Sequence, residues 1–287
     1  MAPTVTRVIP AARTPEGDGM VVQRAFPNQS IARIDPFLML DEMGPITFEP
    51  GARSGFPDHP HRGFETVTML LDGEFEHKDS HGNRGRLRPG DVQWMTAGAG
   101  VVHSEMPSSD LRAKGGRLHG FQLWVNLPQA DKMMRPRYQE MPASSIPEAK
   151  VHGAVVRVVA GDFQGTKAAI DTRTPIQYFH AQLEDDAAVQ FPVPEGHEGF
   201  VYVFHGSASV AGKAVPAHNL AVLSGSGEVT VHAGGEGAHL LFVTGVPLRE
   251  PIFQYGPFVM TTREEIVQAV EDFRSGKFGE IAPTSFA

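Results

Sequence analysis

The stretch ETVTMLLDGEFEHKDSHGN (residues 65–83) decides the fold class of this chain. Residues 65–71 and 74–78 form two short strand-like segments, and the pair Asp72-Gly73 stands between them. An Asp-Gly pair flanked by such segments is a strong signal for a β-hairpin. His81-Gly82-Asn83 marks a further turn, so this stretch alone predicts several short strands joined by tight turns.

Outward from this stretch, the same pattern of strands and turns continues. Residues 85–96 repeat it around the turn pair Pro89-Gly90, and residues 118–127 alternate apolar and polar side chains. Short strands at this spacing are typical of a β-sandwich or a β-barrel. In the second half, FVYVFHG (200–206) parallels VTMLLDG (67–73). This internal repeat predicts a duplicated barrel and an all-β fold.

A change of composition separates the two predicted barrels. Residues 129–150 are rich in proline and charged side chains, which is typical of a connection between domains. We therefore expect one domain over residues 1–135 and a second over residues 136–287. A short helix is predicted near the C-terminus, where Thr262 and Glu265 form a capping box and an apolar stripe follows. We expect this helix to pack on a barrel.

The composition excludes several classes of protein. The net charge of -8 argues against a direct nucleic-acid partner, because nucleic-acid binders usually carry a basic face. The chain has no cysteine, which excludes disulfides and thiolate ligands. It has no apolar run near the roughly 18 residues that span a bilayer, and its first residues lack the apolar core of a signal peptide. We therefore expect a soluble, cytoplasmic protein without a membrane partner.

The sequence His59-Pro60-His61 supplies the first pair of candidate metal ligands. A residue that precedes proline favours extended geometry, and residues i and i+2 of a strand point to the same face. The two imidazoles are therefore expected to project side by side, as a metal ion requires. The chain has 13 histidines, so this motif alone is also compatible with a chance pair on the surface.

A second pair with the same spacing, His103 and Glu105, follows the glycine-rich turn at residues 96–100. Two such pairs can face each other across one barrel. Three imidazoles and a carboxylate suit a divalent ion such as Fe, Mn, Co, Ni or Zn. Glu65 is a rival for the carboxylate, because a period of two places it on the face of His61. Spacing alone leaves Glu65 and Glu105 both open.

The remaining histidines form no ligand-spaced pair. His77 and His81 flank a turn, and we expect them to be exposed at a rim. If the internal repeat is aligned as above, Pro192 and Pro194 occupy the positions of His59 and His61. The second barrel is then predicted to hold no metal.

Taken together, these motifs resemble the pirin family of bicupins. HPHRGFETV (59–67) and QWMTAGAGVVHSEMP (93–107) are the most specific of them. The resemblance covers nearly the whole chain and extends to the following further segments: DPFLMLDEMGP (35–45), GFQLWVNLP (120–128) and EPIFQYGPFVMTTREEIVQAVEDFRSGKFG (250–279).

The resemblance implies two cupin-type β-barrels and a mononuclear iron, Fe²⁺, in the N-terminal barrel. It implies that the iron ligands are the residues matching the family motif: His59, His61, His103 and Glu105. It also favours Glu105 over Glu65 as the carboxylate ligand, and it makes Glu65 a nearby supporting group. Ni, Co, Mn and Zn remain alternative ions for such a donor set.

Two functions follow from the resemblance. Some members are similar to quercetin 2,3-dioxygenases, which open a flavonol ring with O₂ and release carbon monoxide. In this interpretation Glu105 takes the flavonol proton as base, and Phe56, Met95 and Trp124 line an apolar pocket. We predict this activity, with a flavonoid-like molecule and O₂ as substrates.

Other members are described as regulators, and this is the alternative function. The chain would then bind a protein partner, a transcription factor or a metabolic enzyme, and the oxidation state of the iron would alter its surface without turnover. A metal that only stabilises the barrel is a third hypothesis.

Overall fold

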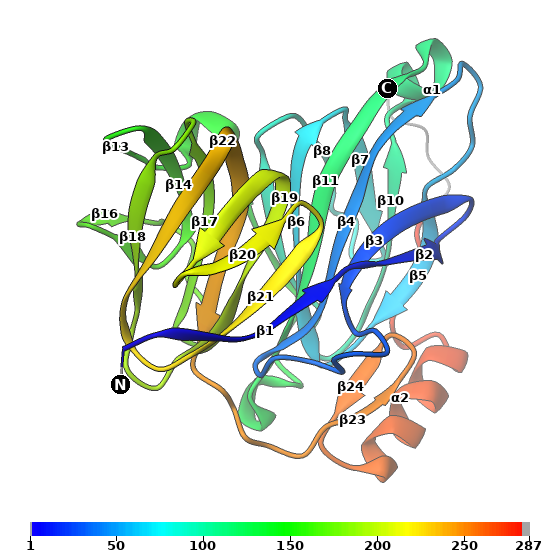
Figure 1. Cartoon of the computed structure of the whole chain (residues 1–287). Helices are drawn as coiled ribbons and strands as arrows, with labels where there is room; N and C mark the ends of the chain where they lie inside the picture. The colour runs from blue at the N-terminus through cyan, green and yellow to red at the C-terminus, as the bar shows by residue number, and fades with distance from the viewer. Residues whose placement is uncertain (1, 283–287) are drawn as a thin grey trace. The chain divides into compact units, whose positions relative to one another are not determined.

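The computed structural model describes residues 2–282, and most of these residues lie in strands. The chain divides into two compact units, each of which contains one β-barrel (Figure 1). We call the unit that contains residues 41–143 the first barrel, and the unit that contains residues 144–248 the second barrel. The predicted all-β fold with two barrels and one short C-terminal helix is confirmed.

The first barrel consists of residues 13–22, 41–143 and 249–287. One of its sheets has seven strands in the order β12-β9-β6-β11-β4-β3-β2, and the other has four in the order β5-β10-β7-β8. The strands are β2 (Ala12–Glu16), β3 (Met20–Phe26), β4 (Phe37–Phe48), β5 (Phe56–His61), β6 (Phe64–Asp72), β7 (Phe75–Asp79), β8 (Arg84–Leu87), β9 (Val92–Thr96), β10 (Val101–Pro107), β11 (Gly116–Asn126) and β12 (Arg137–Met141). Three of them, β2, β3 and β4, begin or end in residues that are assigned to the second barrel.

The second barrel consists of residues 1–12, 23–40 and 144–248. Its sheet follows the order β1-β21-β19-β22-β17-β14-β13, with β18 paired to β22 and β20 paired to β19. The strands are β1 (Thr4–Pro10), β13 (Glu148–Val151), β14 (Ala154–Ala160), β17 (Ile176–Leu183), β18 (Ala188–Val193), β19 (Glu198–Val210), β20 (Lys213–Pro216), β21 (Asn219–Ser224) and β22 (Gly227–Gly245).

This division differs from the single boundary expected between residues 135 and 136. The N-terminal strand β1 pairs with β21 and so belongs to the second barrel, whereas residues 249–287 belong to the first. The boundary differs because the barrel to which a segment belongs depends on the strands it pairs with and on the core it packs against. A change of composition can indicate a linker, but it does not indicate which barrel a terminal segment packs against.

The expected hairpin at Asp72-Gly73 is wrong in its pairing, although both strands exist. β6 pairs with β9 and β11 in the seven-stranded sheet, whereas β7 pairs with β8 and β10 in the four-stranded sheet. The turn therefore carries the chain from one sheet to the other. The next turn, at residues 81–83, does join a paired hairpin of β7 and β8. A turn motif fixes where the chain reverses but not which strand it then pairs with.

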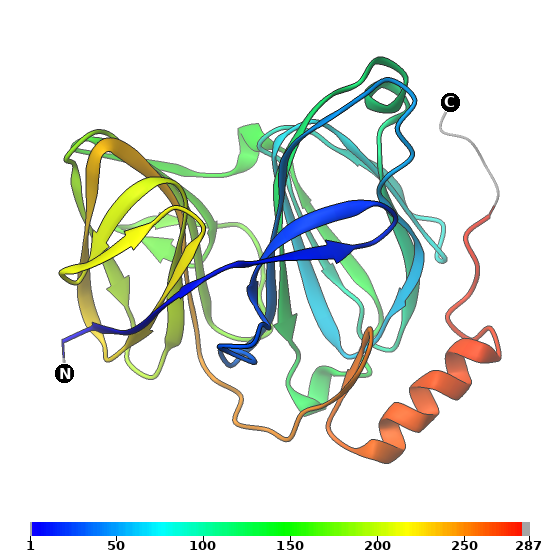
Figure 2. The same cartoon turned by 45° about the vertical axis from the view of Figure 1, so that its right-hand side comes forward.

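The C-terminal segment begins with the small hairpin of β23 (Phe253–Tyr255) and β24 (Phe258–Met260) and continues into α2 (Arg263–Arg274). The predicted capping box is confirmed, because Thr262 and Glu265 each bond the other's backbone at the start of α2. Figure 2 gives a second view of α2 beside β23 and β24. Among residues 2–282, the helices lack the length and hydropathy of a transmembrane span.

Candidate metal centre

Three histidine rings converge inside the first barrel, and they come from two neighbouring strands. β5 carries His59 and His61, and the antiparallel strand β10 carries His103 directly opposite His59. Because His59 and His61 are two residues apart in a strand, both rings point to the same face. The ring centroids are 4.7 Å apart for His59 and His61, 4.4 Å for His59 and His103, and 4.8 Å for His61 and His103.

The ring nitrogens of this cluster are available to a metal ion. One nitrogen from each ring lies within 4.8 Å of the others. Both nitrogens of His61 and both of His103 are buried and have no hydrogen-bond partner among the described residues. Buried polar atoms normally have a hydrogen-bond partner, so unpaired nitrogens at this position indicate a site for a bound ligand such as a metal ion. His59 fits as well, since its Nδ1 lies 2.7 Å from the carbonyl oxygen of Pro57, which leaves Nε2 free to coordinate.

The electrostatics favour the metal-binding form of the rings. Burial, and then the neighbouring His59, hold the pKa of His61 well below its ordinary value. Burial and the other histidines lower the pKa of His103 in the same way. Neutral imidazole is the form that coordinates metals, so these two rings need not lose a proton near neutral pH before a metal binds.

Glu105 lies near this cluster but is not one of the converging groups. Its strand β10 also carries His103, and its side chain is buried. Oε1 accepts a hydrogen bond from Thr68 Oγ1 at 2.9 Å, and Oε2 accepts one from Gln122 Nε2 at 2.8 Å. Gln122 is itself oriented by Trp124, whose Nε1 donates to Gln122 Oε1 at 3.1 Å. The structure thus brings three of the four expected ligands together and holds the fourth in a hydrogen-bonded network.

Glu65 does not support the cluster, contrary to the expectation. The alternation of β5 is interrupted at Arg62-Gly63, where Gly63 has a φ of +87°. In β6, Phe64 contacts His61 and Thr68 contacts Glu105, so the even-numbered residues face the histidines. Glu65 points to the opposite face, where its Oε1 accepts a hydrogen bond from Thr96 at 2.6 Å.

Of the three apolar residues expected to line a pocket, Trp124 lies beside the cluster. Its ring centroid is 5.3 Å from that of His61. Phe64, which the sequence analysis did not single out, lies 4.3 Å from Trp124. Met95 packs in a buried group with Ala97 and Val101, and Phe56 packs in the apolar group that contains Phe75. Phe56 thus belongs to the core, whereas Met95, which pairs with Thr66, lies on the same face of its sheet as Trp124.

The expectation that His77 is exposed is also wrong. His77 is buried in β7, directly opposite Glu105 in the register of β7 with β10. Its Nε2 lies 2.7 Å from Oε1 of Glu140, and its ring stacks on Tyr138. The hydrogen bond from His77 is the main cause that lowers the pKa of Glu140. Alternation from Phe75 is the signal that would have found this inward position, whereas His81 is exposed as expected.

The interior of the second barrel has a different character. In β18 the residues that join the core are Val189, Phe191 and Val193, and the last two lie one position away from the aligned Pro192 and Pro194. Phe191 stacks on Phe242 with ring centroids 4.8 Å apart. β18 thus contributes apolar side chains to the core of the second barrel and contains no histidine.

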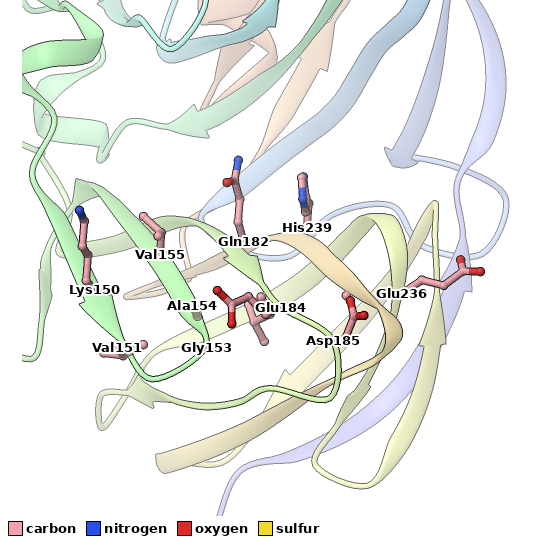
Figure 3. A pocket seen from close by; sticks show the side chains of 12 residues that line it. Lys150, Val151, Gly153, Ala154, Val155, Gln182, Glu184, Asp185, Glu236 and His239 are labelled. Carbon is pink, nitrogen blue, oxygen red and sulfur yellow. The ribbon is translucent and has the colours of Figure 1, made fainter.

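The second barrel also has a hollow of about 520 Å³ on its surface (Figure 3). Its lining includes Lys150 of β13, Gln182 of β17 and His239 of β22, together with the acidic side chains of Glu184 and Glu236. Lys150, Gln182 and both glutamates are exposed. Within the described residues, the hollow gathers no set of converging donor nitrogens like that of the three histidines.

The chain thus contains two β-barrels, and the first carries a His-x-His motif and a third histidine on two paired strands. These features define a bicupin with a candidate metal site in its first barrel. Residues 19–125 match the Pirin family model, and residues 178–279 match the model of the pirin C-terminal cupin domain. The chain therefore belongs to the pirin family.

Known proteins agree with this assignment. The chain is 43% identical over 279 residues to a pirin-like protein of Solanum lycopersicum, which covers 96% of this chain and 92% of the relative. It is 42% identical over 281 residues to human pirin, which covers 96% of this chain and 93% of the relative. The crystal structure of a quercetin 2,3-dioxygenase from Acinetobacter baumannii superposes with a TM-score of 0.92 at 40% identity, over 98% of this chain and 99% of that one.

Proposed function

We propose that this protein is an oxygenase of the quercetin 2,3-dioxygenase type, which cleaves a flavonol with O₂ at one divalent metal ion. The observation that carries the proposal is the set of unpaired ring nitrogens of His61 and His103 beside the free Nε2 of His59. The similarity to a quercetin 2,3-dioxygenase over nearly the whole chain supports the choice of substrate.

His59, His61 and His103 would hold the ion, with Glu105 as the fourth ligand. Fe²⁺ is the ion we propose, and Ni, Co, Mn and Zn suit the same donors. When bound, the ion would act as a Lewis acid and orient the flavonol toward O₂. The protein's own contribution is to present three imidazoles whose ring positions are fixed by two paired strands.

Glu105 is the proposed base for the flavonol hydroxyl. A carboxylate can accept that proton only if it is oriented, and the bonds from Thr68 and Gln122 provide the orientation. Trp124 and Phe64 present aromatic surface next to His61, and that surface suits a flat polyphenol.

The test is aerobic incubation of quercetin with protein of measured metal content. We expect the quercetin absorbance band to disappear, with carbon monoxide as a product, only when both O₂ and the metal are present. Parallel samples loaded with Fe²⁺, Ni²⁺, Co²⁺, Mn²⁺ or Zn²⁺ identify the active ion. If fully loaded protein releases no carbon monoxide over hours, quercetin is not the substrate.

A second candidate is a regulator that binds a protein partner. It is favoured by the position of the exposed large apolar side chains, since four of the five in the described chain lie in the C-terminal segment: Phe253, Tyr255, Val267 and Phe273. This function predicts no turnover, and it predicts partner affinity that differs between ferrous and ferric protein. A tenfold difference corresponds to about 1.4 kcal/mol of coupling.

A further inference from the structure

Arg62, the residue that follows His61, joins three parts of the first barrel. Its side chain is only 5% exposed. Nε donates to the carbonyl oxygen of Ala99 at 2.6 Å, in the turn that precedes β10. Nη1 donates to Oδ2 of Asp272 in α2 at 2.9 Å, and the guanidinium lies 4.5 Å from the ring centroid of Phe278. One side chain thus connects the end of β5, the start of β10 and the C-terminal segment.

The backbone beside His61 is held by the same segment. The amide of Arg62 donates to the carbonyl oxygen of Pro257 at 3.2 Å, and the amide of Val259 donates to the carbonyl oxygen of Arg62 at 3.0 Å. Lys132 adds a buried ammonium, which donates to the carbonyl oxygens of Gly63 at 2.8 Å and Val259 at 3.0 Å. The peptide groups that follow His61 are therefore fixed on both sides.

The backbone before His103 is held as well. The ring of Phe278 lies so close to Gly100 that a Cβ at this glycine would come within 2.6 Å of it. Ser80 Oγ donates to the carbonyl oxygen of Phe278 and accepts a hydrogen bond from the amide of Val102 at 3.1 Å. The C-terminal segment thus contacts the chain immediately next to both ligand-bearing strands.

Asp272 in α2 is the carboxylate that pairs with Arg62. Besides Arg62, it accepts hydrogen bonds from Lys277 Nζ at 2.7 Å and from Gln268 Nε2 at 2.9 Å. Arg62 is buried, whereas the Lys277 side chain is 64% exposed. Removing Asp272 would leave a buried guanidinium without this carboxylate, whereas removing Lys277 would not.

We infer that Arg62 and Asp272 are positioning residues of the metal centre, through which the C-terminal segment sets the placement of His61 relative to His103. The inference rests on the proposed metal site. A metal site tolerates little displacement of its ligands. Substitution of a residue that orients a ligand typically lowers the metal affinity by roughly 10-fold to 100-fold.

The test uses Co²⁺, whose absorption spectrum reports ligand geometry, and measures the dissociation constant by competition with a chelator. Asp272→Ala should weaken Co²⁺ binding by about 10-fold or more and change the spectrum. Asp272→Asn should restore most of the affinity, because its amide oxygen can still accept the bond from Arg62. Lys277→Ala is the matched control, and it should bind Co²⁺ like the unaltered protein.

If Asp272→Ala does not fold, Arg62→Lys replaces it, because an ammonium keeps the charge but cannot bond Ala99 and Asp272 in the same way. The inference is overturned if a folded Asp272→Ala or Arg62→Lys protein has the same Co²⁺ affinity and the same absorption spectrum as Lys277→Ala. Loss of thermal stability in the metal-free protein without a change in Co²⁺ affinity or spectrum overturns it too. Failure of the unaltered protein to bind Co²⁺ would instead refute the metal centre itself.

Discussion

His103 in β10 lies directly opposite His59 in β5, and their ring centroids are 4.4 Å apart. The candidate ligands are therefore set by the register of one antiparallel strand pair. A shift of one residue in that register would turn every side chain of a strand to its other face. The geometry of the cluster thus depends on whatever holds β5 and β10 in place, and the predictions below test this cluster and its surroundings.

Removing one ring should remove most of the metal. We expect His61→Ala to weaken metal binding by more than roughly 100-fold, since a direct ligand matters more than the residues that orient it. The far-UV circular dichroism should persist, because separate apolar groups such as that of Leu70 and Phe75 support the barrel. His81→Ala, at an exposed histidine, is the control. Full metal content in His61→Ala, measured by elemental analysis, would contradict the assignment.

The two glutamates that spacing could not separate should behave differently. Glu105→Gln should abolish turnover and weaken metal binding, because it removes the proposed base and fourth ligand. Glu65→Gln should leave the metal dissociation constant within about threefold, since Glu65 faces away from the histidines toward Thr96. Both constants can be measured by the same chelator competition. Equal losses in the two variants would show that the face assignment of β6 is wrong.

The metal-free protein should lose stability as the pH falls below about 6.5. The pKa values of His61 and His103 are lowered in the folded state, so the unfolded chain takes up protons first. Their contribution is fully present above the ordinary pKa of 6.5 and is lost below it, at about 1.4 kcal/mol per pH unit for each ring. Denaturant unfolding between pH 7.5 and 5.5 should therefore show a shallower pH dependence for His61→Leu than for the unaltered protein. Parallel slopes would refute this.

Lys132 should produce a dependence of the same sign at high pH. Burial lowers its pKa from 10.5 to about 8. Between these values the unfolded chain retains a proton that the folded protein has lost, so the free energy of unfolding should rise with pH, by at most about 1.4 kcal/mol per unit. Lys132→Met should remove this rise. The comparison is denaturant unfolding of both proteins at pH 8 and pH 10, and an unchanged slope in the variant would contradict it.

Gln122 tests the orientation of the proposed base. Gln122→Ala removes the donor to Oε2 of Glu105 and leaves the three histidines in place. We expect kcat for quercetin to fall by about 10-fold or more, while the metal content stays the same. Trp124→Phe is a milder companion, because it removes only the hydrogen bond to Gln122 and keeps an aromatic side chain. If kcat is unchanged in Gln122→Ala, Glu105 does not depend on this bond.

The sequence was informative wherever the deciding interaction is local. His59 and His61 share a face because of the two-residue period of a strand, and the capping box of α2 lies within one turn. Glu65 was misplaced because that period does not continue through Arg62-Gly63. The hairpin at Asp72-Gly73 was misassigned because its two strands pair with residues far away in the chain. His77 was misplaced because it was treated as a turn residue, although alternation from Phe75 places it on the inward face of β7.

The order of the chain has a consequence for biosynthesis. Both ligand strands are complete by residue 107, but the segment that holds the backbone beside them, from Pro257 to Phe278, is translated only after the second barrel. A nascent or prematurely terminated chain would carry every candidate ligand without the contacts that fix them. If those contacts determine the metal affinity, the protein reaches its full affinity for a metal ion only after these last elements have been translated. Tight metal binding would then occur only in chains in which both barrels have been synthesised.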